Sequence, residues 1–429
     1  VIYNIGMSKF NLFLSSESPY VIKSTSKLNI KLGFKRPEPE KALKSLLCNL
    51  LIKPNSWILV QRKKQSMGTK RGNPLGIGIE SFRRVLDALD KYGLIEQDKG
   101  SKLENKQTVI RATEDLLIWF NSSKWTDDDI DVFKAQGVTL RLNEVYKEYV
   151  EFDDTKFSLW LDSELKQCNN LLNNSVICLP NKDGVLIQEK KVATSRGFIK
   201  HEQHPKDGEF LFGGRHVGPW VGLPKIERGR ITINGESTYE YDREASHINA
   251  MYEVVTGKPY QGGDPYELFI QGVEVPRHII KNLSSFSQGA NTARGVSSRV
   301  GRHYNREATK KDAKQKDIDK HQQWLRFIKK TSATKIHQSL MSKHHLVRDY
   351  YLRGKQYGDM ISGWEADLVF EVVIELTRRG IPCLTVYDSF IVQSKYKGLV
   401  KVLVKKTRFI NRRNITSLLE VDKEVTFTL

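Results

Sequence analysis

The chain has 429 residues, of which 69 are Lys or Arg and 50 are Asp or Glu, so its formal net charge is +19. Hydrophobic residues make up 39% and aromatic residues 10%, a composition that supports a folded core and excludes a largely disordered chain. So large a basic excess favours a polyanion such as nucleic acid as the partner.

The cysteines and the apolar runs narrow the class of protein further. None of the four cysteines forms a Cys-x-x-Cys pair, so neither a zinc module nor a disulfide framework is expected. No run reaches about 18 consecutive apolar residues, and the first 13 residues lack the unbroken apolar stretch of a secretory signal. We therefore expect a cytoplasmic, DNA-associated protein with no membrane partner.

The chain begins with residues 1–39, an N-terminal segment that mixes short apolar runs with Ser, Lys and Pro. Its end, Pro37-Glu-Pro39, is typical of a linker. Residues 40–116 then form one small predicted domain. Apolar residues at helical spacing predict helices over 41–52 and 79–92.

A two-stranded hairpin is expected after the second of these helices. Gly93 ends the helix, a strand starts at Leu94, and residues 106–111 return beside it. Helix, helix and hairpin together resemble a winged helix, in which the helix before the wing enters the DNA major groove. That helix carries Arg83 and Arg84, which we expect to contact DNA; packing or protein contact is the alternative.

Residues 117–194 are expected to be a helical connecting or thumb-like region without a readable function. A glycine-rich run over 213–220 follows, where the backbone can approach a ligand closely, and Arg215 within it is expected to touch template or primer. The Asn-Gly pair at 234–235 predicts a β-hairpin. Asp242 therefore stands at the end of a hairpin strand.

The next part of the chain, residues 243–380, is predicted to be mainly helical, including an amphipathic helix over 363–379. Between residues 294 and 316 it carries eight Lys or Arg against two acidic residues. Such a run favours a phosphate-contacting surface, with a merely solvated helix face as the alternative. The residues expected to bind nucleic acid there are Arg294, Arg299 and Arg302.

Two carboxylates, Asp242 and Asp388, each lie at the end of a β-rich run. Residues 383–392 are predicted to form one or two strands with Asp388 at their turn, and a helix and a last strand are expected over 396–429. Carboxylates at the tips of adjacent strands can hold two divalent metals, and two metals about 4 Å apart serve phosphoryl transfer. We expect two Mg²⁺ ions, with Mn²⁺ as a substitute; turn capping by the aspartates is the alternative.

Four motifs, in this order, resemble the palm and fingers of the family A DNA polymerases and the related single-subunit phage-type RNA polymerases, over roughly residues 205–395. The strand ending in Asp242 looks like the first carboxylate motif, and Thr-Val-Tyr-Asp388-Ser-Phe looks like the second. Arg277-His-Ile-Ile-Lys281 is similar to the fingers helix. Gly-Trp-Glu-Ala-Asp at 363–367 resembles the helix that lies against primer and template.

The resemblance implies roles for these residues. Asp242 and Asp388 would bind the metals, and Arg277 and Lys281, on one helix face, would grip the incoming triphosphate. Lys281 would also donate to charge developing in the transition state. His247 stands at the position that helps to choose the sugar, where its bulk would crowd a 2′-hydroxyl and favour dNTPs; a hydrogen-bonded structural histidine is the alternative.

The chain departs from the family pattern at several positions. Tyr387 stands where His usually precedes the second aspartate, and Ser389 follows that aspartate as in the RNA polymerase branch. Four and eight residues after the fingers lysine, where an aromatic is usual, the chain has Ser285 and Gly289. The first 190 residues show no ordered set of exonuclease acidic motifs.

The expected fold is therefore α+β, with a right-hand polymerase-like palm and fingers over 195–429 preceded by the winged-helix-like domain. The expected function is an exonuclease-free DNA polymerase of a phage, plasmid or mobile element, acting on a DNA template, a primer and nucleoside triphosphates beside other replication proteins. Primase or RNA polymerase activity is the first alternative. A non-enzymatic replication initiator and a nuclease that adds Glu240 and Glu244 to the carboxylates are the others.

Overall fold

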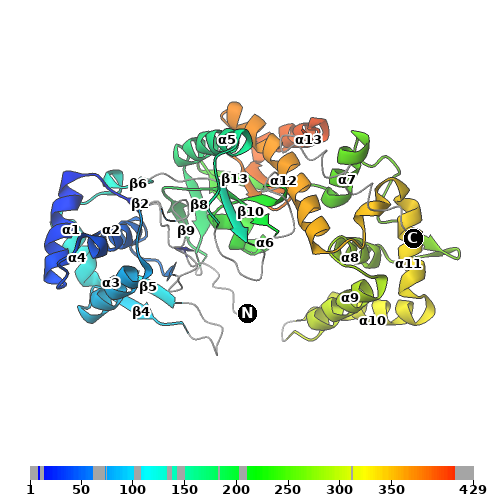
Figure 1. The fold of residues 1–429 in the computed structure, drawn as a ribbon, viewed down its shortest axis with the longest axis horizontal. Coiled ribbons are helices and arrows are strands. Elements are labelled where there is room, and N and C mark those ends of the chain that lie inside the picture. The colour runs from blue at the N-terminus through cyan, green and yellow to red at the C-terminus, as the bar shows by residue number, and fades with distance from the viewer. Residues whose placement is uncertain are drawn as a thin grey trace. The chain divides into compact units, whose positions relative to one another are not determined.

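The computed structural model of the chain is mixed α+β, as predicted, and contains a curled sheet (Figure 1). It describes residues 8–9, 14–60, 73, 75–100, 108–132, 138–142, 150–181, 184–201, 210–310 and 313–410. The chain divides into two compact units, which are treated separately below. Unit 1 comprises Val1–Gln203, His216–Asp242 and Val373–Val402, and unit 2 comprises His204–Arg215, Arg243–Val372 and Leu403–Leu429.

The N-terminal part of unit 1 packs helices against a four-stranded sheet of order β1-β3-β5-β4 (Figure 1). The helices are α1 (Pro19–Lys31), α2 (Pro37–Ile52), α3 (Ile79–Lys91) and α4 (Glu114–Ser122). The strands are β1 (Ser8–Lys9), β3 (Ile58–Val60), β4 (Ile95–Asp98) and β5 (Thr108–Ala112). One apolar core joins these elements from Val21 to Ile130.

The two helices and the hairpin predicted here are confirmed by α2, α3 and the antiparallel pairing of β4 with β5, in which Ile95 lies opposite Ala112. The predicted linker at Pro37-Glu-Pro39 is wrong, because these residues form the first turn of α2. Proline is tolerated in a first helical turn, where its missing N–H would have no intrahelical partner. Residues 101–107, between β4 and β5, lie outside the described residues.

The rest of unit 1 contains a six-stranded sheet of order β16-β17-β13-β12-β8-β9. Its strands are β8 (Ile177–Pro180), β9 (Leu186–Glu189), β12 (Thr232–Ile233), β13 (Glu236–Asp242), β16 (Leu384–Val386) and β17 (Ser389–Gln393). The other elements include β2 (Leu14–Ser15), β6 (Asp131–Val132), β7 (Val138–Leu142), α5 (Lys156–Asn173), β10 (Ser195–Lys200) and α6 (Lys225–Arg228). The region 117–194 therefore contains the expected helical structure together with strands.

Both predicted hairpins of this sheet are confirmed. β12 and β13 turn at Asn234-Gly235, whose φ angles are +53° and +77°, the left-handed values that a two-residue hairpin turn favours. β16 and β17 turn at Tyr387-Asp388, with Tyr387 at φ +58°. A non-glycine residue seldom adopts this backbone conformation, so the turn is tightly constrained.

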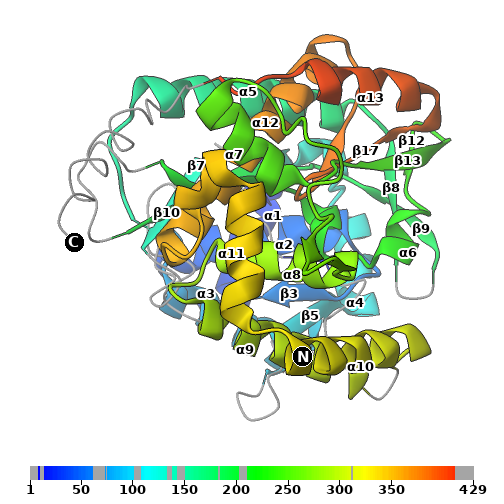
Figure 2. The same cartoon turned by 90° about the vertical axis from the view of Figure 1, so that its right-hand side faces the viewer.

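Unit 2 is mainly helical, as predicted (Figure 2). Its helices are α7 (Ser246–Thr256), α8 (Arg277–Ser287), α9 (Ala293–Ala308), α10 (Gln315–Lys330) and α11 (Ala333–Lys343). A two-stranded ribbon consists of β14 (Phe269–Ile270) and β15 (Val273–Glu274). The division between the units falls within β11 (Phe212–Val217), after β13, within α12 (Lys355–Arg378) and within α13 (Lys397–Lys406).

The predicted helix near the C-terminus is confirmed by α13, and the predicted last strand lies outside the described residues. The predicted helix over 363–379 is also confirmed, although α12 begins eight residues earlier, at Lys355. Among the described residues, no helix combines the length and the apolarity that crossing a membrane requires.

Candidate active site

The structure brings the two predicted carboxylates to one edge of the unit 1 sheet. β13 and β17 are antiparallel neighbours, and their register sets Asp242 opposite Ser389. Asp388 is the residue before Ser389, in the turn that joins β16 to β17. Neighbouring strands lie about 4.8 Å apart. The Ser389 hydroxyl donates to Asp242 Oδ1 at 2.5 Å, so the second motif also orients the carboxylate of the first.

The hairpin that carries Asp388 is held from beneath by buried side chains. The indole Nε1 of Trp220, which is fully buried, donates to the carbonyl oxygen of Thr385 at 2.8 Å. The Thr385 hydroxyl lies 3.1 Å from His216 Nδ1, and His216 Nε2 lies 2.7 Å from Thr194 Oγ1. Sequence reasoning noted Trp220 only as part of a glycine-rich run, because its partner lies 165 residues away.

His216 is neutral in this arrangement. Burial, reinforced by the nearby Arg196 guanidinium, lowers the pKa of His216 to about 3. Both ring nitrogens instead face threonine hydroxyls, which can donate or accept as the ring requires. The hairpin therefore stands on a neutral hydrogen-bond network.

The carboxylate of Glu240, which lies on the same strand face as Asp242, is already bound by an arginine. Arg228 grips it with two parallel bonds, Nη2 to Oε1 at 2.7 Å and Nε to Oε2 at 3.2 Å, and both side chains are largely buried. Such a fork occupies both carboxylate oxygens. Glu240 is therefore not available as a third metal ligand.

The donor set at the sheet edge fits a hard cation. Asp242 is exposed and Asp388 is half-buried, and both present carboxylate oxygens. Mg²⁺ is usually held by one or two carboxylates with water and substrate phosphates in its remaining positions. Among the described residues no group of three or more His, Cys, Asp and Glu side chains has the arrangement of metal ligands, and a two-carboxylate Mg²⁺ site does not need one.

A second site-like cluster lies within unit 2, around His247 in the first turn of α7. Glu365, on α12, places Oε2 2.9 Å from Arg215 Nη2 and 3.3 Å from His247 Nε2. The other ring nitrogen, Nδ1, lies 2.6 Å from the Oε1 atom of Gln288, the residue that ends α8. Two of the predicted site residues, Arg215 and His247, thus meet through a carboxylate that was not among them.

The charges of this cluster stabilise one another. Burial alone would lower the pKa of His247, but the Glu365 carboxylate and the Gln288 oxygen outweigh it and raise that pKa. Burial would raise the pKa of Glu365, but His247 and Arg215 together hold it below its usual range. The imidazole and the guanidinium therefore share one carboxylate, which favours the charged form of the ring against the opposing charge of Arg215.

Gln288 is positioned by close backbone packing. The residues that follow α8 bond to those that precede α12, with Gly354 N donating to Ala290 O at 3.0 Å. A Cβ on Gly358 would lie 3.1 Å from the Gln288 carbonyl oxygen, so a larger residue there would push this backbone away by a few tenths of an ångström. Glu365 carried one sequence signal: it is a carboxylate in a helix stretch whose neighbours are apolar.

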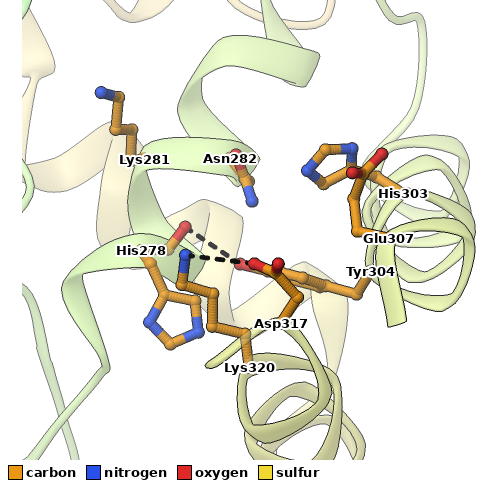
Figure 3. A pocket seen from close by; sticks show the side chains of 8 residues that line it. All are labelled: His278, Lys281, Asn282, His303, Tyr304, Glu307, Asp317 and Lys320. Carbon is orange, nitrogen blue, oxygen red and sulfur yellow. Dashed lines mark hydrogen bonds and ion pairs between the residues drawn. The ribbon is translucent and has the colours of Figure 1, made fainter. Parts of the chain in front are cut away.

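The predicted fingers pair lies on α8. Arg277, at the start of the helix, donates from Nε to Asp264 Oδ2 at 2.5 Å and lies over the Tyr266 ring at 5.0 Å. Lys281, one turn later, is exposed, and within the described part of the chain its ammonium has no hydrogen-bond or ion-pair partner. Figure 3 shows that ammonium pointing away from the carboxylates of Asp317 and Glu307. Lys281 is therefore the more available cation of the two.

Behind Lys281 lies a cavity of about 250 Å³ between α8, α9 and α10 (Figure 3). Its polar walls are partly satisfied, since Tyr304 donates to the His278 carbonyl oxygen at 3.1 Å and Lys320 faces Asp317 at 4.0 Å. Two cations and two carboxylates line it, so it has no strong preference for either sign of charge. The lining residues are His278, Lys281, Asn282, His303, Tyr304, Glu307, Asp317 and Lys320.

The predicted nucleic-acid-binding arginines of α9 are exposed. The buried side chains of α9 recur at Val296, Val300 and Tyr304, so the arginines lie off this apolar stripe. Two of them also bond within the chain: Arg299 Nη1 donates to the Gly289 carbonyl oxygen, and Arg302 Nη1 donates to Ser298 Oγ. The exposed members of the set are Arg294, Arg299 and Arg302.

The outward face of α3, the predicted recognition helix, mixes charges. Arg83 pairs with Glu80 at 2.7 Å, and Arg84 lies over the Phe34 ring at 5.6 Å. Asp87, on the same helix, faces Lys99 at 3.6 Å. This face is less uniformly basic than a phosphate-binding surface usually is.

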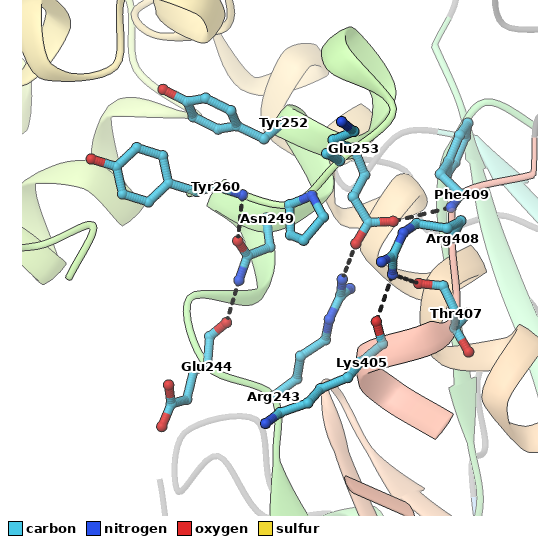
Figure 4. A network of polar contacts seen from close by, with 12 residues as sticks. Arg243, Glu244, Asn249, Tyr252, Glu253, Tyr260, Lys405, Thr407, Arg408 and Phe409 are labelled. Carbon is cyan, nitrogen blue, oxygen red and sulfur yellow. Dashed lines mark hydrogen bonds and ion pairs between the residues drawn. The ribbon is translucent and has the colours of Figure 1, made fainter. Parts of the chain in front are cut away.

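The residue after Asp242 begins a buried ion pair inside unit 2 (Figure 4). Arg243 Nη2 lies 2.9 Å from Glu253 Oε1, and Glu253 Oε2 accepts from the Phe409 backbone N–H at 3.1 Å. Asn249 bonds the Glu244 carbonyl oxygen and the Tyr260 backbone N–H in the same view. This network fixes the start of α7, where His247 stands.

No protein-family model, no curated protein and no solved structure matches the chain. The function is therefore argued from the residues and their geometry alone.

Proposed function

We propose that the chain is a template-directed nucleotidyltransferase, an exonuclease-free DNA polymerase of a phage, plasmid or mobile element. In this proposal β13, β16 and β17 belong to a palm and α8 to fingers. The observation that carries it is the register that sets Asp242 opposite Ser389 and Asp388 in the adjoining turn. Two sequence-distant carboxylates at one sheet edge are the ligand arrangement that two-metal phosphoryl transfer uses.

Asp242 and Asp388 would hold two Mg²⁺ ions, with Mn²⁺ as a substitute. Bound there, the metal would lower the pKa of a primer 3′-hydroxyl and neutralise triphosphate charge. Ser389 keeps the Asp242 carboxylate in one orientation through its 2.5 Å hydrogen bond. Lys281 would bind the triphosphate as a mobile cation, and Arg277 would exchange Asp264 for a phosphate oxygen.

The remaining residues would handle the polymer and the sugar. His247 would crowd a 2′-hydroxyl and so favour dNTPs. Arg215 and the arginines of α9 would contact DNA template or primer. Arg83 and Arg84 of the winged-helix-like part would recruit the enzyme to a DNA site, beside other replication proteins.

The geometry disfavours the two other classes of function. Of the two further carboxylates that a nuclease could add, Glu240 is occupied by Arg228 with two hydrogen bonds and Glu244 lies beyond the end of the strand. A non-enzymatic initiator gains nothing from exposed carboxylates beside bound phosphate, because like charges repel. An RNA polymerase or primase would share the carboxylates and the phosphate-binding cations, and would differ in the nucleotides that it incorporates and in its need for a primer.

Primer extension tests the proposal. The protein would be assayed with Mg²⁺ on primed and unprimed DNA, with dNTPs and with NTPs in separate reactions. Extension of the primer with dNTPs is the expected result. Products from NTPs without a primer would make the protein a primase or RNA polymerase, and no incorporation by folded protein that binds DNA would support the initiator.

Asp388→Asn should reduce synthesis at least roughly a hundred- to thousand-fold, the scale for losing one preorganised electrostatic group. Asp388 is a half-buried turn residue, so thermal stability and DNA affinity should change little. Asp128→Asn, at an exposed position of the same unit, is the matched control and should keep full activity. An active Asp388→Asn enzyme would show that the site is elsewhere.

A further inference from the structure

Both nitrogens of the His247 ring are occupied from within unit 2. The Oε1 atom of Gln288 lies 2.6 Å from Nδ1, and the Oε2 atom of Glu365 lies 3.3 Å from Nε2. The two partners are almost fully buried, with 3% and 4% of their surfaces exposed. The imidazole itself keeps 24% of its surface exposed, so one edge of a fixed ring reaches solvent.

We propose that Glu365 is a specificity-determining positioning residue, which locks the His247 ring so that neither ring nitrogen can pair with a 2′-hydroxyl. This inference rests on the proposed function and extends it. Glu365 would act without touching the nucleotide. Arg215 completes the lock, because its guanidinium donates to the same Glu365 oxygen at 2.9 Å.

Fixing both ring nitrogens matters because an unconstrained histidine would discriminate poorly between ribose and deoxyribose. An imidazole with an open nitrogen can accept from or donate to a hydroxyl, so it would bind a ribose about as readily as it excludes one. With both nitrogens engaged, a ribose hydroxyl meets only ring carbon and loses its hydrogen bonds to water. A buried hydroxyl without a partner is strongly disfavoured, whereas the deoxy sugar loses nothing.

The groups that face the ring come from three elements. β11 contributes the Arg215 cation, whose Nη2 lies 3.3 Å from Nε2 and whose charge opposes protonation of the ring; α12 contributes the Glu365 anion, and the end of α8 contributes the neutral Gln288 amide. The acceptor oxygens of Glu365 and Gln288, one beside each ring nitrogen, favour the form in which both nitrogens carry hydrogen. The close packing at Gly358 keeps Gln288 in place on the α8 side.

The first measurement is spectroscopic and needs no activity. Nitrogen-15 NMR of the histidine side chains, followed against pH, should show His247 keeping both ring protons to a higher pH than an ordinary histidine in the unmodified protein. Glu365→Gln should lower the pH at which this ring loses a proton, because the amide supplies no charge. Glu375→Gln, which breaks an exposed pair on the same helix, is the matched control and should leave the His247 signals unchanged.

The second measurement is nucleotide selection. The ratio of Kd for NTP to Kd for dNTP would be measured by titration with Mg²⁺, together with kcat and KM for incorporation of each. Glu365→Gln should lower the discrimination about tenfold or more, mainly through a lower KM for NTPs. His247→Ala should lower it as well, and the double variant should add little to either single change.

The outcomes separate this inference from the function beneath it. The inference is overturned, while polymerase activity stands, if His247 titrates as an ordinary histidine in the unmodified protein. It is also overturned if a folded Glu365→Gln variant discriminates between NTPs and dNTPs as the unmodified protein does. If the protein binds dNTPs selectively but does not incorporate them, the proposed polymerase function is wrong and the proposed role of Glu365 still holds. If Glu365→Gln does not fold, Gln288→Ala frees the other ring nitrogen and should still lower selection; unchanged selection there overturns the inference.

Discussion

The strand-end site of unit 1 and the His247 cluster of unit 2 treat carboxylates in opposite ways. Asp242 is exposed and accepts one hydrogen bond from a neutral serine, whereas Glu365 is buried and carries two cationic donors on one oxygen. Asp242 keeps lone pairs and charge for a ligand from outside. Glu365 is neutralised internally, so its role is to shape its neighbours.

The buried histidines of the two regions differ in the same way. His216 in unit 1 lies among threonine hydroxyls, and burial beside Arg196 lowers its pKa. His247 in unit 2 lies against Glu365, and its pKa is raised. Burial opposes the charged form at both positions, so the presence or absence of one carboxylate decides the direction in which the pKa of the ring is shifted.

The largest stability effect should come from a buried pair of unit 2. Glu253→Gln removes the charge that faces Arg243, whose side chain is 8% exposed, and leaves a cation buried without its counter-charge. We expect a loss of about 3 kcal/mol in the free energy of unfolding, measured by urea denaturation. The amide can still accept from the Phe409 N–H, which keeps the loss near the lower end of the usual range.

The matched control for this change is an exposed pair of unit 1. Glu236→Gln breaks the contact between Glu236 and Lys395, which lies in solvent, and should cause no measurable loss. Equal effects of the two changes would contradict the view that unit 2 depends on internally paired charge.

The next largest effect should be a loss of unfolding free energy at acid pH, caused by His216 in unit 1. His216 has a pKa of about 3 in the folded chain and an ordinary value near 6.5 when unfolded, so the unfolded chain binds the extra proton between these values. Stability contributed by the neutral ring is complete above the unfolded pKa and falls as the pH drops. Between pH 7 and pH 5 its share of the loss should be about 2 kcal/mol.

His216→Gln should remove that share of the pH dependence, whatever it does to stability at pH 7. The measurement is the difference between urea unfolding free energies at pH 7 and pH 5. His345→Gln, at an exposed position, should keep the original difference. An unchanged pH dependence in His216→Gln would mean that the ring is already charged in the folded chain.

Local elements could be predicted from the sequence because their signals are local. Apolar spacing gave α3, and the Asn-Gly pair at 234–235 gave the turn between β12 and β13. The turn at Asp388 also followed from a short apolar run broken by polar residues. The prolines at 37 and 39 predict a linker but form the first turn of α2, because proline is common both in linkers and at the start of a helix.

The partners of the site residues could not be predicted, because they depend on contacts between distant parts of the chain. Glu365 meets Arg215 across 150 residues, and Trp220 meets Thr385 across 165. The addition of β8 and β9 to the sheet is likewise a long-range pairing. Hydrophobic periodicity says which face of an element is buried and not which element covers it.

The smallest effect on stability should come from the neutral hydrogen bonds that hold the hairpin of Asp388. Thr385→Val removes a buried hydroxyl that lies 3.1 Å from His216 Nδ1 and keeps the shape of the side chain. The same hydroxyl donates to the His216 carbonyl oxygen at 3.2 Å, and the expected loss is about 1 kcal/mol in urea denaturation, the low end for two neutral hydrogen bonds. Thr256→Val, at an exposed helix position, is the control and should change stability less.

Thr385→Val also tests whether the support serves the site. Because Thr385 lies three residues before Asp388 on the same hairpin, loosening it should lower the rate of synthesis while DNA affinity and the His247 NMR signals stay unchanged. Neutral bonds would then position the carboxylates of unit 1 as the charged lock positions the imidazole of unit 2. A variant that loses stability without losing rate would show that the turn holds Asp388 unaided.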